Sequence, residues 1–124
     1  MSIVKTNSIE ALSGGGFPAN LIPATAKAWC NWNGAGGAIH DSYNVSSVSD
    51  TGTGSAVINF TTAMSDTNFL PMTTMKTLGL NPEVMASCIH TITTSSVMVV
   101  SSFCHPNAYA YRDFTHSYLM VFGD

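Results

Sequence analysis

Apolar and polar residues alternate through most of the chain after residue 25. Between residues 26 and 32 the side chains of Ala28, Cys30 and Trp32 fall on one face, and Trp29 falls on the other. A period of two is typical of a β-strand with one face toward a core. A tryptophan on each face predicts that both sides of this strand are covered.

The same alternation, interrupted by glycine-rich turns, predicts further strands. Turn sequences occupy 33–37 and 50–54, so the first two strands are expected to pair as a hairpin. Pro71 confines its strand to a sheet edge or a bulge, because proline has no N–H for the ladder. The predicted strands are 26–32, 39–45, 56–61, 69–75, 87–93, 97–103 and 117–122, with 94–96 as a tight link. This spacing predicts an all-β fold, an antiparallel β-sandwich of about seven or eight strands.

Three segments depart from this rhythm. Residues 78–85 fit a helical turn, and residues 104–114 are predicted to form an aromatic, polar loop. Before the first strand, the run Ser13–Pro18 contains three consecutive glycines and predicts a flexible break. We expect residues 1–25 to form an extended N-terminal arm for docking or oligomerisation, and residues 26–124 to form the sandwich module.

Aromatic residues give the candidate core and the candidate recognition loop. The expected core aromatics are Trp29, Trp32, Tyr43 and Phe60, with packing of Trp29 across a subunit boundary as an alternative. The predicted loop carries side chains that stack on sugar rings, bridge their hydroxyls or anchor protein interfaces. These candidate recognition or interface residues are Asn107, Tyr109, Tyr111, Arg112 and Asp113. A plain subunit contact or a solvated loop is the alternative reading of the segment.

Composition changes the list of possible partners. Charged residues make up 9% of the chain, against roughly 25% in typical soluble domains, and Ser, Thr, Asn and Gly supply the polarity instead. The net charge is −3, and the four basic residues are scattered, which argues against a basic nucleic-acid-binding face. Neither a membrane-length apolar run nor a signal-peptide pattern occurs. We therefore expect no nucleic-acid or membrane partner and synthesis in a cytoplasm.

Candidate chemistry is sparse. The three cysteines are an odd number at wide spacing and are read as free thiols. A zinc site can be imagined from Cys88, His90, Cys104 and His105, but that spacing is not a usual ligand clip. A nucleophilic set drawn from Cys104, His105 or His116, and Asp113 has no supporting signature around it. We therefore expect no enzyme activity, no metal and no cofactor.

Several motifs resemble a known family. They are Ala26–Gly34 (AKAWCNWNG), Asp41–Val48 (DSYNVSSV), Asn59–Met64 (NFTTAM) and Val121–Asp124 (VFGD). In order and spacing they resemble a β-module of bacteriophage tail-fibre and related virion structural proteins. The likeness is specific from Ala26 to Phe69 and thin from Met72 to Thr115.

The resemblance implies a structural protein of a bacteriophage virion, a small fibre or fibre-tip component for host-surface attachment or particle assembly. It further implies a homotrimer, with outer loops that face a host surface glycan or another virion protein. The N-terminal arm would then dock to capsid or tail. A capsid decoration or head-fibre protein that braces the shell is the first alternative, and a free carbohydrate-binding module is the second.

Overall fold

Strands account for all the regular secondary structure in the computed structural model, which describes residues 25–76, 84–105 and 108–123. The strands are β1 (Ala26–Trp32), β2 (Ile39–Tyr43), β3 (Val45–Gly52), β4 (Ser55–Phe60), β5 (Leu70–Met75), β6 (Val84–Thr93), β7 (Ser96–His105), β8 (Ala108–Tyr111) and β9 (Ser117–Phe122). The all-β prediction is confirmed. The proposed helical turn at 78–85 lies mostly outside the described residues, and its last two positions begin β6.

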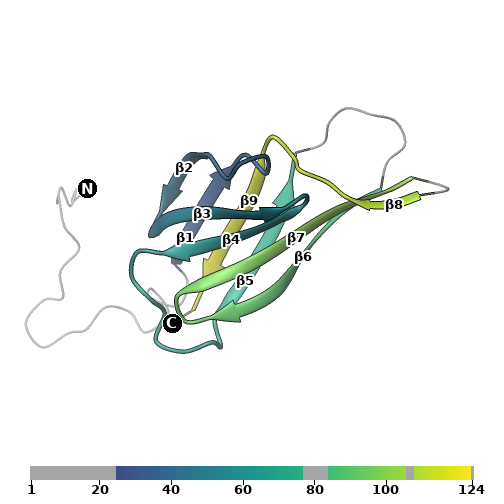
Figure 1. Cartoon of the computed structure of the whole chain (residues 1–124). Helices are drawn as coiled ribbons and strands as arrows, with labels where there is room; N and C mark the ends of the chain where they lie inside the picture. The colour runs from purple at the N-terminus through teal and green to yellow at the C-terminus, as the bar shows by residue number, and fades with distance from the viewer. Residues whose placement is uncertain (1–24, 77–83, 106–107, 124) are drawn as a thin grey trace, which may run out of the picture.

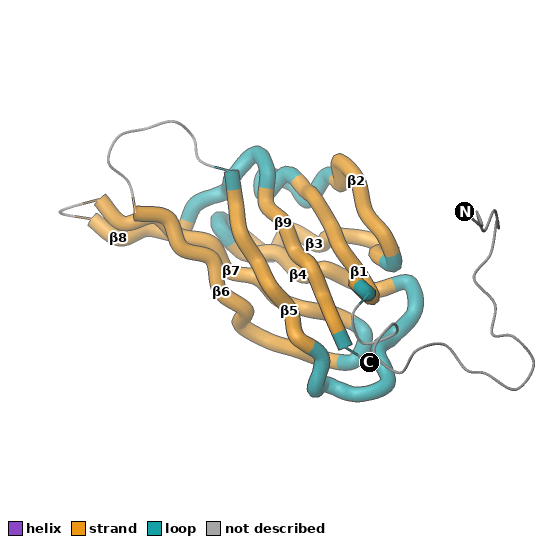
Figure 2. Tube along the Cα trace, turned by 180° about the vertical axis from the view of Figure 1, so that it is seen from behind, coloured by secondary structure: helices purple, strands orange, loops and turns teal. Residues whose placement is uncertain are grey.

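The strands form two antiparallel sheets packed face to face as a β-sandwich. Sheet A has the order β2-β1-β9-β5, and sheet B has the order β3-β4-β7-β6, with β8 beside β7. Figure 1 looks onto sheet B, and Figure 2, seen from behind, looks onto sheet A. β5 pairs only with β9 at the edge of sheet A, which is the position that Pro71 requires.

Asn44 is the corner at which the chain passes from sheet A to sheet B. The sequence predicted one strand over 39–45, but the structure divides it into β2 and β3 at this residue. Asn44 has a φ of 54°, a left-handed conformation that asparagine tolerates better than most residues. Its side-chain amide donates to the carbonyls of Lys27 and Thr62 and accepts from the N–H of Thr62. These bonds hold the corner against the neighbouring strand and loop.

The long strands β6 and β7 extend beyond the sandwich and carry β8 with them (Figure 1). β4 pairs with the first half of β7, up to Val100, and β8 pairs with its second half, from Ser102. The prediction of a loop over 104–114 is therefore wrong for residues 104–105, which end β7, and for residues 108–111, which form β8. The pattern was hard to recognise because β8 has only four residues, too few for alternation to stand out.

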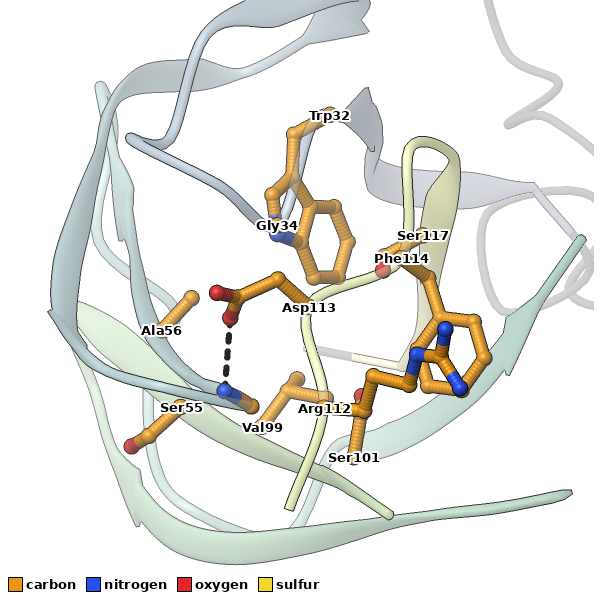
Figure 3. A pocket seen from close by; sticks show the side chains of 11 residues that line it. Trp32, Gly34, Ser55, Ala56, Val99, Ser101, Arg112, Asp113, Phe114 and Ser117 are labelled. Carbon is orange, nitrogen blue, oxygen red and sulfur yellow. Dashed lines mark hydrogen bonds between the residues drawn. The ribbon is translucent and has the colours of Figure 1, made fainter. Parts of the chain in front are cut away.

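Gly54 joins the β3–β4 turn to the segment that connects β8 with β9. Its N–H donates to Oδ1 of Asp113 over 2.6 Å, the bond drawn as a dashed line in Figure 3. Its carbonyl accepts from the N–H of Ser101 over 2.7 Å. A Cβ at this position would lie 2.3 Å from the carbonyl oxygen of Ser101 and 2.7 Å from the nitrogen of Arg112. Only glycine fits this crossing, where φ is +69°.

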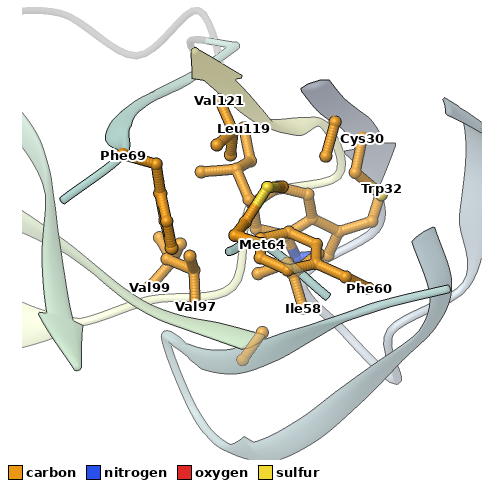
Figure 4. Packing of buried hydrophobic residues seen from close by; sticks show 12 residues of the cluster. Cys30, Trp32, Ile58, Phe60, Met64, Phe69, Val97, Val99, Leu119 and Val121 are labelled. Carbon is orange, nitrogen blue, oxygen red and sulfur yellow. The ribbon is translucent and has the colours of Figure 1, made fainter. Parts of the chain in front are cut away.

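The core fills the space between the two sheets (Figure 4). It consists of alternate residues of β1, β4, β7 and β9 with two loop residues: Ala28, Cys30, Trp32, Ala56, Ile58, Phe60, Met64, Phe69, Val97, Val99, Leu119 and Val121. Phe60 and Phe69 meet edge to face, with ring centroids 5.9 Å apart.

Two of the four aromatic residues expected in the core are found there. Trp32 and Phe60 are buried. The prediction is wrong for Tyr43, which is 57% exposed, and for Trp29, which is half-buried on the outer face of sheet A. The physical reason is the register: Trp29 and Tyr43 are opposite each other across β1 and β2, so both point away from the face that carries Cys30 and Trp32.

Candidate functional site

The predicted recognition residues separate into two groups with different surroundings. Tyr109 and Tyr111 are two positions apart on β8, so they share one face of the strand. They are 68% and 57% exposed, and their rings meet edge to face with centroids 6.2 Å apart. Arg112 and Asp113 are only partly exposed, and their side chains contact residues of the sandwich. The Arg112 guanidinium lies 5.1 Å from the centre of the Phe103 ring, and Asp113 binds Gly54. Asn107 lies outside the described residues.

The space beside Asp113 does not suit a ligand. The cavity there is about 10 Å³ and is lined by residues that include Trp32, Val99 and Phe114 (Figure 3). That volume approximates one water molecule. Asp113 therefore has a structural role, the support of Gly54, and the two tyrosines are the most exposed members of the predicted recognition set in the part of the chain that the structure describes.

The histidines and cysteines considered for chemistry are spread over the fold. His116 stacks on His40, with ring centroids 4.6 Å apart and planes 17° from parallel. Cys88 is opposite Val100 and Cys104 is opposite Val84 on β6 and β7, so their Cα atoms are separated by roughly 13 Å along the strands. That span is too long for a disulfide between them. Among residues whose side chains the structure describes, no cluster of three potential metal ligands occurs.

Cys30 and Cys88 are free thiols in contrasting environments. Cys88 is exposed on β6, whereas Cys30 is buried between the sheets. Burial raises the pKa of the Cys30 thiol to about 11, because the thiolate would lose its hydration. The Cys30 side chain therefore behaves as a small core residue at neutral pH.

The outer face of sheet A carries a row of apolar side chains that crosses all four strands. In register, Tyr43 of β2 is opposite Trp29 of β1, Trp29 is opposite Met120 of β9, and Met120 is opposite Met72 of β5. Directly opposite residues on one face have their Cβ atoms about 5 Å apart, so the row is continuous. Tyr43 and Met72 are each 57% exposed, and Met120 is 46% exposed.

A second pair extends this row. Leu70, which is 60% exposed, is opposite Phe122 on the same face. We define the sheet A patch as Trp29, Tyr43, Leu70, Met72, Met120 and Phe122. Figure 2 shows that no described segment lies over this face of the sheet. Between β9 and β5 the patch is hollowed into a depression of about 190 Å³, lined by Met72, Tyr118 and Met120 among others.

The outer face of sheet B is polar along β3 and at the turn between β6 and β7. Asn59 on β4 donates through its amide to the hydroxyls of Ser47 and Ser49 on β3, and the hydroxyls of Thr93 and Ser96 are 2.9 Å apart. The hydroxyl and amide groups on sheet B form hydrogen bonds readily with water. Large apolar patches such as the one on sheet A are rare on monomers and mark contact sites. The two faces of the sandwich therefore differ in what they can contact.

Met72, Met120 and Leu70 were not among the functional residues predicted from the sequence. Alternation already placed Trp29 on the face opposite the core, but the register that aligns it with methionines of β9 and β5 is a long-range property. The available signal was an apolar residue at an outward position of each of several strands.

Comparison with protein-family models, with curated proteins and with solved structures finds no match. In the described part of the chain, no helix could cross a membrane.

Proposed function

We propose that this chain is a non-enzymatic structural protein of a bacteriophage particle, and that its sandwich assembles with copies of itself through the sheet A patch. The observation that carries the assembly step is the continuous row of Tyr43, Trp29, Met120 and Met72 across the sheet. A sheet surface with apolar side chains in register, three of them about half exposed, loses unfavourable contact with water when it is covered.

A second copy is the occupant that the chemistry of this face supports best. Its central row is uncharged, and the outward positions of β1 and β2 on either side of it add one cation, Lys27, and one anion, Asp41. An uncharged apolar row is complementary to the same row on a second copy, because a two-fold interface brings the same patch of both copies together. A strongly charged partner would find little to pair with.

The virion location and the trimer come from the motifs at Ala26–Gly34, Asp41–Val48 and Asn59–Met64. Three sheet A patches around one axis would form an apolar interior, with sheet B outside. In this proposal residues 1–25 fix the assembly to capsid or tail. A small fibre component and a shell-decorating protein both fit such an assembly.

Quantitative mass spectrometry of purified particles tests the location. Particles from a culture that carries this gene are expected to contain the chain. A copy number close to that of the major shell protein identifies a decoration protein, and a much smaller number identifies a fibre. If the chain is absent from particles that contain the other structural proteins, the virion proposal is wrong.

A further inference from the structure

A hollow on the outer face of sheet B lies at the point where β8 replaces β4 beside β7. Ser55 of β4 is opposite Val100, and Tyr111 of β8 is opposite Ser102, two positions further along β7. The break between the two strands leaves a depression of about 300 Å³, at the lower end of the roughly 300–1,000 Å³ typical of small-ligand sites. It is lined by Thr51, Gly52, Thr53, Ser55, His90, Met98, Val100 and Tyr111. We call it the Tyr111 hollow.

The side chains of the Tyr111 hollow are of two kinds. Tyr111 gives an aromatic ring that is 57% exposed, and Met98 and Val100 add partly buried apolar surface. The remaining side chains are polar and exposed or half-exposed: three hydroxyls and an imidazole. The hydroxyls of Thr51 and Ser55 lie 2.8 Å apart. Among the residues whose side chains the structure describes, no Asp, Glu, Lys or Arg lines the hollow.

A β-bulge supplies the imidazole. The register of β6 against β7 shifts between Ile89 and Thr91, so His90 is the extra residue. Bulges re-aim a side chain and are over-represented next to functional sites. Here the bulge leaves His90 exposed at the hollow, with its Nδ1 2.9 Å from the hydroxyl of Thr91.

We propose that the Tyr111 hollow binds a saccharide. A pyranose ring has one face of C–H groups, which packs on an aromatic ring and on aliphatic side chains, and a rim of hydroxyls, which both donate and accept hydrogen bonds. The C–H face of the sugar matches the apolar surface of Tyr111, Met98 and Val100. Its hydroxyls match the polar side chains of Thr51, Ser55 and His90. A phosphate or carboxylate ligand would need a cation, and a purely apolar ligand would leave the hydroxyls without partners.

The position of the hollow suits a polysaccharide. It is an open depression on the face opposite the sheet A patch, so assembly through that patch leaves it accessible. Tyr109, on the same face of β8 and in edge-to-face contact with Tyr111, extends the aromatic surface toward a neighbouring sugar unit. The saccharide proposal does not depend on the virion proposal, because it uses a different surface and a different measurement.

Saturation-transfer NMR on the full chain tests the proposal. The probes are methyl glycosides of common hexoses, 6-deoxyhexoses and N-acetylhexosamines at about 10 mM, tenfold above a Kd of about 1 mM. We expect saturation transfer from the protein to the C–H protons of at least one glycoside. The Tyr111→Ala variant should reduce this transfer at least about fivefold.

Ile39→Ala is the control, since Ile39 is an exposed apolar residue of β2 that belongs to neither the sheet A patch nor the Tyr111 hollow. It should leave the transfer unchanged, and His90→Ala should weaken it. The proposal is overturned if no glycoside receives saturation, or if Tyr111→Ala and Ile39→Ala change the transfer equally. Neither result would bear on the oligomeric state, which is measured separately.

Discussion

The carboxylate of Asp113 accepts a 2.6 Å hydrogen bond from the backbone N–H of Gly54, 59 positions earlier in the chain. This bond ties the β3–β4 turn of sheet B to the segment that leads into β9 of sheet A. A bond to an ionised acceptor is stronger than one between neutral groups. Asp113 therefore stabilises the junction between the two sheets, although its sequence context had suggested recognition.

Asp113→Ala should lower the free energy of unfolding by about 1–3 kcal/mol, because the N–H of Gly54 loses its acceptor in a partly buried position. Asp66→Ala is the matched control: Asp66 accepts an equally short bond, 2.6 Å, from the N–H of Asn68, but in an exposed local turn. Its loss should be below about 1 kcal/mol. Urea unfolding followed by tryptophan fluorescence measures both. Equal losses would show that the Asp113 bond has no special weight.

Gly54→Ala should lower the free energy of unfolding by about 3 kcal/mol or more, since a left-handed φ and a backbone clash act together. Gly36→Ala separates the two effects. Gly36 also has a positive φ, +86°, but a Cβ there meets nothing within 4 Å, so the expected loss is about 1 kcal/mol. The same urea titration gives the comparison. A Gly54→Ala protein as stable as Gly36→Ala would contradict the close crossing.

The raised pKa of Cys30 predicts a loss of stability in alkaline solution. The unfolded thiol has a pKa of 9.0 and the buried thiol one of about 11, so the folded state holds its proton more tightly. The contribution of the protonated Cys30 thiol to the free energy of unfolding is fully present below pH 9. It declines as the pH rises toward 11, by at most about 2–3 kcal/mol. The free energy of unfolding should therefore decrease more between pH 8 and pH 10 for the wild type than for Cys30→Ala. Parallel curves would show that Cys30 does not titrate with folding.

Local alternation was enough to predict the core strands. It separated Ala28, Cys30 and Trp32 from Trp29, and it placed turns at 33–37 and 50–54, because these signals depend on residues close together in sequence. Alternation could not show that the chain changes sheets at Asn44. That change depends on bonds from Asn44 to Lys27 and Thr62, 17 and 18 positions away.

The candidate surfaces were harder to predict from the sequence than the core strands. Tyr109 and Tyr111 were recognised by residue type, but their strand was not, since pairing with β7 is a long-range event. The sheet A patch depends on the register of β1, β9 and β5, and the Tyr111 hollow depends on a bulge and on a break between two strands. Alternation assigns faces to residues but does not assign neighbours to strands.

Charges placed in the sheet A patch should prevent assembly. In the double variant Met72→Lys/Met120→Lys, two cations occupy opposite positions on β5 and β9, and their burial against another copy is costly. We expect the dissociation constant of the oligomer to rise at least about 100-fold, which two unpaired charges account for readily. Sedimentation velocity over a concentration series measures it.

The matched control is Ser47→Lys/Ser49→Lys, which adds the same two charges to exposed positions of β3 on the other face. This control should keep the wild-type association. Circular dichroism of both variants should match the wild type, since all four substituted side chains are exposed. Equal dissociation of the two variants would assign the effect to net charge and not to the patch.

The molar mass of the wild-type chain in solution, measured by light scattering behind size-exclusion chromatography, tests the assembly proposal most directly. We predict a mass of at least twice the 13.1 kDa of one chain, and three times that value for the trimer that the motifs imply. A mass of one chain at every concentration up to about 1 mM would contradict the assembly proposal. A dissociation constant above that concentration is too weak for a specific homo-oligomer.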